Sequence, residues 1–293
     1  MACKTNYQNT GKSRCQLDWM LIKKVIAIPY GTEFTGSDID SWIMAGIHNA
    51  DPAKRFYPMP DFTGIEDNST EGSTYTSGYG QETPITDGLV GFTQTYTPDV
   101  CLQNRIKKGF NDNLVRSFLI IDSANKIWGV KTTNGLKGFT GKMFPKVSGA
   151  TMADSISEPT IAYRLTVATE MENKWFEESD LTAEELDGLL DITLNAVTES
   201  TNLVITFSAD GCGNEDVTPE LATLGGVAAC WLVGDSTGYE PISTAPTYDA
   251  TKNVFTVASN TVSTGKTLKL AAPDVLYANG VSFKECVRGY TAQ

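Results

Sequence analysis

The sequence predicts a mainly β protein with two domains: a domain of antiparallel strands accompanied by α-helices, followed by an immunoglobulin-like β-sandwich. A length of 293 residues has room for two cores. Apolar runs of strand length alternate with turn residues through most of the chain, and helical periodicity nearly vanishes after residue 177. We place the first domain at 1–178, an acidic linker or short helix at 179–190, and the second domain at 191–293.

The first elements are a strand and a helix. The run "LDWMLIKKVIAIPY" predicts a strand over 17–30 that ends at its proline. Ser37 can cap the helix that follows, with Asp38 and Asp40 at its positive dipole end. An apolar stripe at helical spacing supports this helix, formed by Ile39, Trp42, Ile43 and Ile47.

Residues 57–88 form a long polar stretch that includes "DNSTEGSTYTSGYGQETPITDG". Low hydrophobicity makes disorder one interpretation. The many Thr and Tyr residues favour another, a long extended hairpin or loop that orders when it pairs with something. The sequence leaves both open.

The rest of the first domain predicts one more helix among antiparallel strands. "LVGFTQTYT" alternates like a strand, and Pro98 can begin a helix whose last turn holds Lys107 and Lys108. "LVRSFLIID", "SANK" and "IWGVKT" predict a hairpin, followed by one or two strands over 136–150. A last strand at 159–171 places one set of side chains on one face: Ile161, Tyr163, Leu165 and Val167. The connections are too short for crossover helices, so we expect antiparallel pairing.

The second domain contains short β runs such as "TNLVITFSAD", "GVAACWLVGD" and "VSFKECVRGY". Turns separate them, and five to seven strands in about 105 residues are typical of an immunoglobulin-like sandwich. Trp231, within one of these runs, is expected in the core.

Two tripeptides resemble the end of a phosphate-binding loop, Gly265-Lys266-Thr267 and Gly11-Lys12-Ser13. The full pattern needs a glycine five residues earlier, where this chain has Asn260 and Asn6. It also needs a helix after the lysine, whereas "KTLKLAA" alternates like a strand. We therefore expect no nucleotide site, and interpret "NTVSTG" as a hairpin turn with a positive φ at Gly265.

No metal, cofactor or catalytic site is expected. The six cysteines are scattered and are most simply small core residues: Cys3, Cys15, Cys101, Cys212, Cys230 and Cys286. The single histidine, His48, falls in a helix's last turn, where it can meet free carbonyls, and is expected to be structural. The loop "DGCGNED" is expected to be a solvated turn, with a weak cation site formed by its acids as the alternative: Asp210, Glu215 and Asp216. No G-x-S-x-G motif occurs, so we do not expect an enzyme.

The net charge and the hydropathy of the chain limit the kinds of partner that it is expected to bind. Acidic residues exceed basic ones by 35 to 23, giving a net charge of −12. Such a chain is not expected to grip nucleic acid through phosphates, although it suits a surface along which DNA slides. No apolar run is long enough for a membrane span, and the N-terminal residues lack an apolar signal core, so we expect folding in a cytoplasm.

Several segments resemble virion proteins of phages that infect Bacteroides and related gut bacteria. The opening "CKTNYQNTGKSRCQLDWMLIKKVIAIPYGTEF" is similar to their N-termini. The block from "RFYPMPDFTGIEDNSTEGSTYTSGYG" to "LIIDSANKIWGVKTTNGLKGFTGKMFPKV" is similar to their tail proteins. The resemblance covers about residues 1–175 and implies a tail tube (major tail) protein, with a tail-tube-like β-sandwich or barrel and flanking α-helices. Residues 191–293 resemble the immunoglobulin-like modules appended to phage structural proteins.

The resemblance implies a homo-oligomer of stacked hexameric rings whose channel conducts DNA without binding it specifically. The implied location is the virion tail, assembled in the host bacterial cytoplasm beside other tail and connector proteins. A head–tail adaptor or another minor tail or capsid protein is the alternative within this class. A carbohydrate- or host-surface-binding module is the alternative of another class, with Tyr239 and Tyr248 as candidate glycan contacts.

Overall fold

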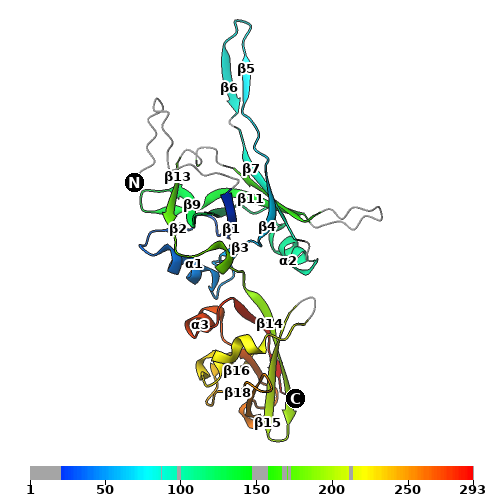
Figure 1. The fold of residues 1–293 in the computed structure, drawn as a ribbon. Coiled ribbons are helices and arrows are strands. Elements are labelled where there is room, and N and C mark those ends of the chain that lie inside the picture. The colour runs from blue at the N-terminus through cyan, green and yellow to red at the C-terminus, as the bar shows by residue number, and fades with distance from the viewer. Residues whose placement is uncertain are drawn as a thin grey trace, which may run out of the picture. The chain divides into compact units, whose positions relative to one another are not determined.

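The computed structural model describes residues 21–86, 88–97, 100–146, 158–166, 170, 173–210 and 214–292. Figure 1 shows a mainly β chain, as the sequence predicts. It divides into two compact units. The first holds the residues up to Met44 together with Ala53–Asp187, and the second holds Ala45–Pro52 together with the residues from Gly188 on.

In the first unit, eleven strands of the described residues join into one sheet. The main path is β2-β10-β9-β8-β11-β12-β7-β4, with β1, β3 and β13 paired beside it. Every pairing is antiparallel, as expected. The bounds are β1 (Ile22–Ile28), β2 (Glu33–Phe34), β3 (Tyr57–Pro58), β4 (Phe62–Asp67), β7 (Val90–Tyr96), β8 (Arg116–Asp122), β9 (Lys126–Lys131), β10 (Leu136–Lys137), β11 (Phe139–Lys146), β12 (Thr160–Leu165) and β13 (Lys174–Glu178).

Strand β8 lies at the centre of this sheet. It pairs with β1 along one edge and with β11 and β9 along the other. Its residues Phe118, Leu119, Ile120 and Ile121 are all fully buried, so both faces of the strand are covered. A continuous apolar run without alternation is therefore what this position requires.

Two helices accompany the sheet, α1 (Ile39–Ile47) and α2 (Val100–Phe110). In α1, Trp42 packs against Phe34 and Phe56 with ring centroids 5.4 and 4.8 Å away. In α2, Ile106 joins a core that includes Phe92, Phe118 and Trp128. Lys107 and Lys108 occupy the last turn of α2, as predicted.

The cap of α1 corrects the sequence prediction. The carboxylate of Asp38, and not the hydroxyl of Ser37, accepts the N–H of Ser41 at 3.0 Å. Asp38 directly precedes the helix, so its side chain reaches the amide of the third helical residue. Asp40 also does more than complement the dipole, because its carboxylate accepts Ser179 Oγ–H at 2.5 Å and the N–H of Asp180 at 2.9 Å.

The polar stretch 57–88 contains a long hairpin, which confirms that interpretation over disorder. Strands β4 and β7 pair within the sheet, and beyond them β5 (Ser73–Thr76) pairs with β6 (Glu82–Thr86). Between these pairs, the N–H groups of Asn68 and Thr70 bond the carbonyls of Gly91 and Leu89, both at 2.8 Å. We call residues 68–89 the arm; Figure 1 shows β5 and β6 standing beyond the ends of β4 and β7.

The second unit contains a five-stranded and a four-stranded sheet among the described residues. The strand orders are β18-β19-β15-β14-β21 and β17-β16-β20-β22. Both sheets contribute to one core, for example Phe255 from the first and Leu268 from the second, and Trp231 lies in it as predicted. The bounds are β14 (Leu190–Glu199), β15 (Asn202–Ala209), β16 (Trp231–Asp235), β17 (Gly238–Pro241), β18 (Thr247–Asp249), β19 (Val254–Ala258), β20 (Thr267–Leu270), β21 (Lys284–Arg288) and β22 (Tyr290–Thr291).

Two predictions for this unit are wrong. Strands β19 and β20 lie in different sheets, so "NTVSTG" joins the sheets and is not a hairpin turn, although Gly265 has the expected positive φ of 81°. Helical structure also persists after residue 177. The helix α3 (Pro273–Ala278), which begins on Pro273, was not predicted. The same holds for the 3₁₀ turns η4 (Thr218–Leu224), η5 (Ala228–Cys230) and η6 (Ser259–Thr261).

The segment predicted as an acidic linker or short helix packs on the first unit up to Asp187. It contains the 3₁₀ turn η3 (Ala183–Glu185), where the Glu185 carboxylate accepts the N–H and the hydroxyl of Thr182, both at 2.9 Å. Lys24 of β1 reaches this turn, because its Nζ donates to the carbonyl of Ala183 at 2.9 Å. Strand β13, just before the segment, was not predicted.

Candidate functional site

The phosphate-loop tripeptide lies at the start of a strand. Thr267 begins β20, so no helix N-terminus follows Lys266. The Nζ of Lys266 instead forms an ion pair with Asp235, whose pKa this hydrogen bond holds below its usual range. Lys269, in the same strand, places its Nζ 3.6 Å from the ring centroid of Tyr239. The second tripeptide, Gly11-Lys12-Ser13, lies outside the described residues.

His48 is buried within the second unit. Its Nε2 accepts the N–H of Phe283 at 2.9 Å, and its ring stacks on Tyr277 with centroids 4.2 Å apart. A nitrogen that already accepts a buried main-chain N–H is not placed to take a proton from a substrate. The contact suits a structural histidine, although this nitrogen binds an amide where a carbonyl was expected.

In "DGCGNED", Asp216 uses its carboxylate in the local fold, whereas Asp210 and Glu215 take part through main-chain groups. The carboxylate of Asp216 accepts the N–H of Thr218 at 2.9 Å, and the Asp210 N–H donates to the Asp191 carbonyl at 2.8 Å. The carbonyl of Glu215 accepts the N–H of Ala209 at 2.8 Å. Within the described ranges, no group of three or more His, Cys, Asp or Glu side chains is placed to hold a metal ion.

The cysteines do not all behave as expected. Cys230 is free and buried, and burial raises the pKa of its thiol. Cys286 is free and half-buried, with its pKa also raised by burial. Cys101 is disulfide-bonded, which corrects its interpretation as a reduced core residue. The remaining cysteines lie outside the described residues: Cys3, Cys15 and Cys212.

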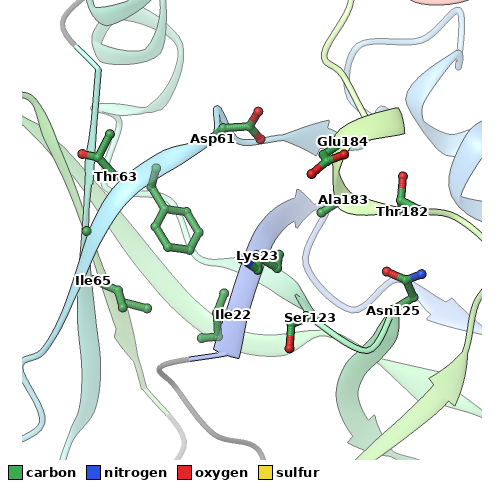
Figure 2. A pocket seen from close by; sticks show the side chains of 12 residues that line it. Ile22, Lys23, Asp61, Thr63, Ile65, Ser123, Asn125, Thr182, Ala183 and Glu184 are labelled. Atoms are coloured by element: carbon green, nitrogen blue, oxygen red, sulfur yellow. The ribbon is translucent and has the colours of Figure 1, made fainter.

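A pocket of about 730 Å³ opens on the first unit (Figure 2). Residues of β1, of the segment Asp61–Ile65, of the turn after β8 and of η3 line it. The buried Lys24 connects these elements, since its Nζ lies 2.8 Å from Asp61 Oδ1 and donates to the carbonyl of Ala183 at 2.9 Å. The lining contains no histidine or cysteine, and its ionisable groups are Lys23, Asp61 and Glu184. This arrangement indicates a structural role, in which Lys24 holds β1, β4 and η3 together, and does not indicate a catalytic one.

The two candidate glycan contacts are engaged within the second unit. Tyr239 is 37% exposed and is covered on one side by the ammonium of Lys269. Tyr248 donates its hydroxyl hydrogen to Asn253 Oδ1 at 3.1 Å, and its ring lies 4.9 Å from that of Phe255. One face of the Tyr239 ring and the hydroxyl of Tyr248 are therefore already engaged within the unit.

The arm differs from these sites because most of its side chains at residues 68–83 are exposed to solvent. Every residue of β5 is exposed, Tyr75 by 60% and Tyr79 at the tip by 101%. Short hydrogen bonds hold the tip, with the N–H of Ser77 donating to Gln81 at 2.8 Å and the N–H of Gly80 to Ser77 at 2.8 Å. The arm therefore offers a preformed β ribbon and two aromatic side chains to a partner.

A second exposed surface was missed by the sequence analysis. On β11, Lys142, Phe144 and Lys146 alternate with the buried residues Met143 and Pro145. Arg164 of the neighbouring β12 lies on the same face, with its guanidinium carbon 5.6 Å from the centroid of the Phe144 ring. The alternation in "KMFPK" was the available indication of a basic outer face.

No protein-family model matches the chain, and no curated protein matches it either. In the part of the chain that is described, no helix has the length and apolar character needed to cross a membrane. The arm is the described feature that contacts within the chain explain least, and it is the candidate functional surface.

Proposed function

We propose that this chain is a structural virion protein, the tail tube protein of a tailed bacteriophage. Its first unit would carry the tail-tube-like fold and form stacked hexameric rings around a channel that conducts DNA. Its second unit would be an immunoglobulin-like module on the outside of the tube. No catalytic step and no cofactor enter this role. The resemblance of residues 1–175 to phage tail proteins supports it.

The arm is the observation that carries the proposal. An isolated two-stranded ribbon is marginally stable in water, and every side chain of the β5–β6 pair whose burial is described is exposed. Binding to a neighbouring molecule would stabilise such a ribbon. A subunit that repeats in rings has such a neighbour in every copy.

Further features agree with an assembling protein. Among the described strands, β4 ends the main path of the sheet, and its outer edge pairs with none of them. The net charge of −12 suits a channel that DNA passes without adhering. A disulfide at Cys101 needs an oxidising environment, which a virion meets after it leaves the host cytoplasm.

The test is assembly of the purified protein with and without its distal arm. Thr70 and Leu89 form an antiparallel bridge, so residues 71–88 can be replaced by the hairpin turn Asn-Gly. We expect the full chain to form rings and tubes in negative-stain electron microscopy. The shortened chain should stay folded by circular dichroism and fail to form tubes.

Other results would favour other functions. Single rings that never stack would indicate a head–tail adaptor or another minor virion component. A strict monomer at high concentration that binds glycans would indicate a surface-binding module. Tubes formed equally well by the shortened chain would remove the arm from the assembly mechanism.

A further inference from the structure

We propose that the exposed face of β11 and β12 is the surface on which the arm of a second copy of this chain docks. The inference rests on the proposed function and assigns the arm a receptor. We call this surface the basic face: Lys142, Phe144, Lys146 and Arg164.

The basic face contains two opposed positive charges that no carboxylate of the described residues neutralises. Lys142 and Arg164 occupy directly opposed positions on β11 and β12. Like charges at opposed positions destabilise a strand pair. Among the described residues, neither side chain has a carboxylate within ion-pair distance. Lys142 bonds a neutral acceptor, Asn113 Oδ1, at 3.1 Å.

The nearest acid in sequence to that acceptor is committed elsewhere. Asp112 receives two hydrogen bonds from the guanidinium of Arg116, at 2.8 and 2.5 Å. An incoming carboxylate is therefore the missing complement of the opposed pair. Phe144, 39% exposed between these charges, adds an apolar contact.

Small residues extend the basic face across the sheet. The register places Ala162 opposite Phe144 and Thr93 opposite Ala162. Thr95 and Gly91 lie two positions to either side of Thr93 on the same face of β7. Asn68 Nδ2 bonds Thr93 Oγ1 and Ser69 Oγ bonds Gly91, so the part of the sheet face left open to a ribbon lies over Ala162 and the charged side chains.

The arm has the matching chemistry. Its residues 68–89 include three acids, Glu71, Glu82 and Asp87, and no lysine or arginine. Glu71 and Glu82 are exposed, as are Tyr75 and Tyr79. Carboxylates can pair with Lys142 and Arg164, while a tyrosine ring can pack on Phe144 or under the guanidinium.

Geometry requires that the arm bind another copy. The arm continues β4 and β7 away from the sheet, as Figure 1 shows, and from Asn68 to Tyr79 it spans roughly 35 Å at about 3.3 Å per residue. Folding it back onto its own sheet would break the bonds that join Asn68 to Gly91 and Thr70 to Leu89. The ribbon can therefore reach a basic face only on a neighbour.

Nucleic acid is the other anionic partner that such a face could bind. Three cations in a chain of net charge −12 are few for phosphate contacts, which normally engage many basic side chains. The acidic arm is present in every copy at equal concentration. The observations thus favour a second copy of the chain.

The experiment uses charge reversal in the full chain. The variant Lys142→Glu/Arg164→Glu changes the sign of the basic face but keeps like charges opposed, so the stability of the subunit should be unchanged. The variant Glu71→Lys/Glu82→Lys changes the arm. The variant Lys252→Glu/Arg288→Glu makes the same charge change on exposed residues of the second unit. Assembly is measured by sedimentation velocity over a concentration series, and folding by circular dichroism.

We expect each of the first two variants to need at least about tenfold more protein for half-assembly, the two combined to recover, and the control to behave as wild type. Rings and tubes that are unaffected by either reversal would overturn the docking surface while leaving the proposed function intact. A wild-type chain that never assembles would overturn both. Reversals of the basic face that leave assembly unchanged but abolish DNA retention in a gel-shift assay would assign this surface to nucleic acid.

Discussion

The carboxylate of Asp122 accepts the indole N–H of Trp128 at 2.8 Å, inside the hairpin that joins β8 to β9. The same carboxylate accepts the N–H groups of Ala124 and Lys126 at 2.8 and 3.0 Å. Asp122 is 9% exposed, so three donors depend on one shielded acceptor. Replacing the carboxylate by an amide would turn an NH₂ group toward at least one of these donors.

We therefore expect Asp122→Asn to lower the free energy of unfolding by about 2 kcal/mol. Urea denaturation, followed by circular dichroism, measures the loss. Asp249→Asn is the matched control, because Asp249 also anchors a turn through the N–H groups of Thr251 and Lys252 but lies in exposed hydrogen bonds. An equal loss of free energy of unfolding in the two variants would show that burial does not determine how much the Asp122 hydrogen bonds stabilise the fold.

The Asp112–Arg116 pair predicts a pH dependence. The guanidinium of Arg116 lowers the pKa of Asp112 from its ordinary 3.8 to about 2. Because the folded-state pKa is depressed, this pair stabilises the fold fully above pH 4 and loses that contribution as pH falls toward 2. The pair is partly exposed, so solvent screening leaves about 1 kcal/mol or less.

Asp112→Asn should remove this contribution above pH 4 and flatten the stability profile between pH 4 and pH 2. Urea titrations at half-unit pH steps measure the profile. Glu158→Gln serves as the control, since Glu158 is an exposed acid of the same unit. Parallel profiles for the wild type and Asp112→Asn would contradict the assignment.

The sequence predicted the elements of this fold more accurately than their partners. The alternating runs at Val90–Tyr96 and Thr160–Leu165 are strands because alternation is a local property. The error at "NTVSTG" is of the other kind: two correctly predicted strands belong to different sheets, and only tertiary packing decides which strand pairs with which.

The candidate site shows the same division. The polar composition of 57–88 left disorder and an extended hairpin as alternatives, and the basic face depends on the cross-strand register between β11 and β12. The opposed positions of Lys142 and Arg164 could not be read from either strand alone. Likewise, the buried position of Lys24 becomes intelligible only with Asp61 and Ala183 beside it.

His48 predicts a specific loss of stability in the second unit. His48→Phe preserves an aromatic ring for Tyr277 but removes the acceptor of the Phe283 N–H. Leaving that donor unsatisfied should cost about 1–3 kcal/mol in the free energy of unfolding. Tyr277→Phe, which keeps the stack, should change stability by less than about 1 kcal/mol. Thermal unfolding by calorimetry measures both, and a neutral His48→Phe would show that the hydrogen bond is dispensable.

Gly88 predicts a loss of arm geometry without loss of the fold. A Cβ built at Gly88 would lie 2.3 Å from the carbonyl oxygen of Thr70, on the backbone of the opposite strand. Gly88→Ala must therefore displace the base of the arm, whereas Gly78→Ala meets no atom within 4 Å and should be tolerated. We expect Gly88→Ala to raise the rate of limited proteolysis within 71–83 several-fold and to weaken assembly, with little change in the thermal unfolding of the subunit. Equal protease sensitivity of the two alanine variants would show that this close approach does not fix the arm's direction.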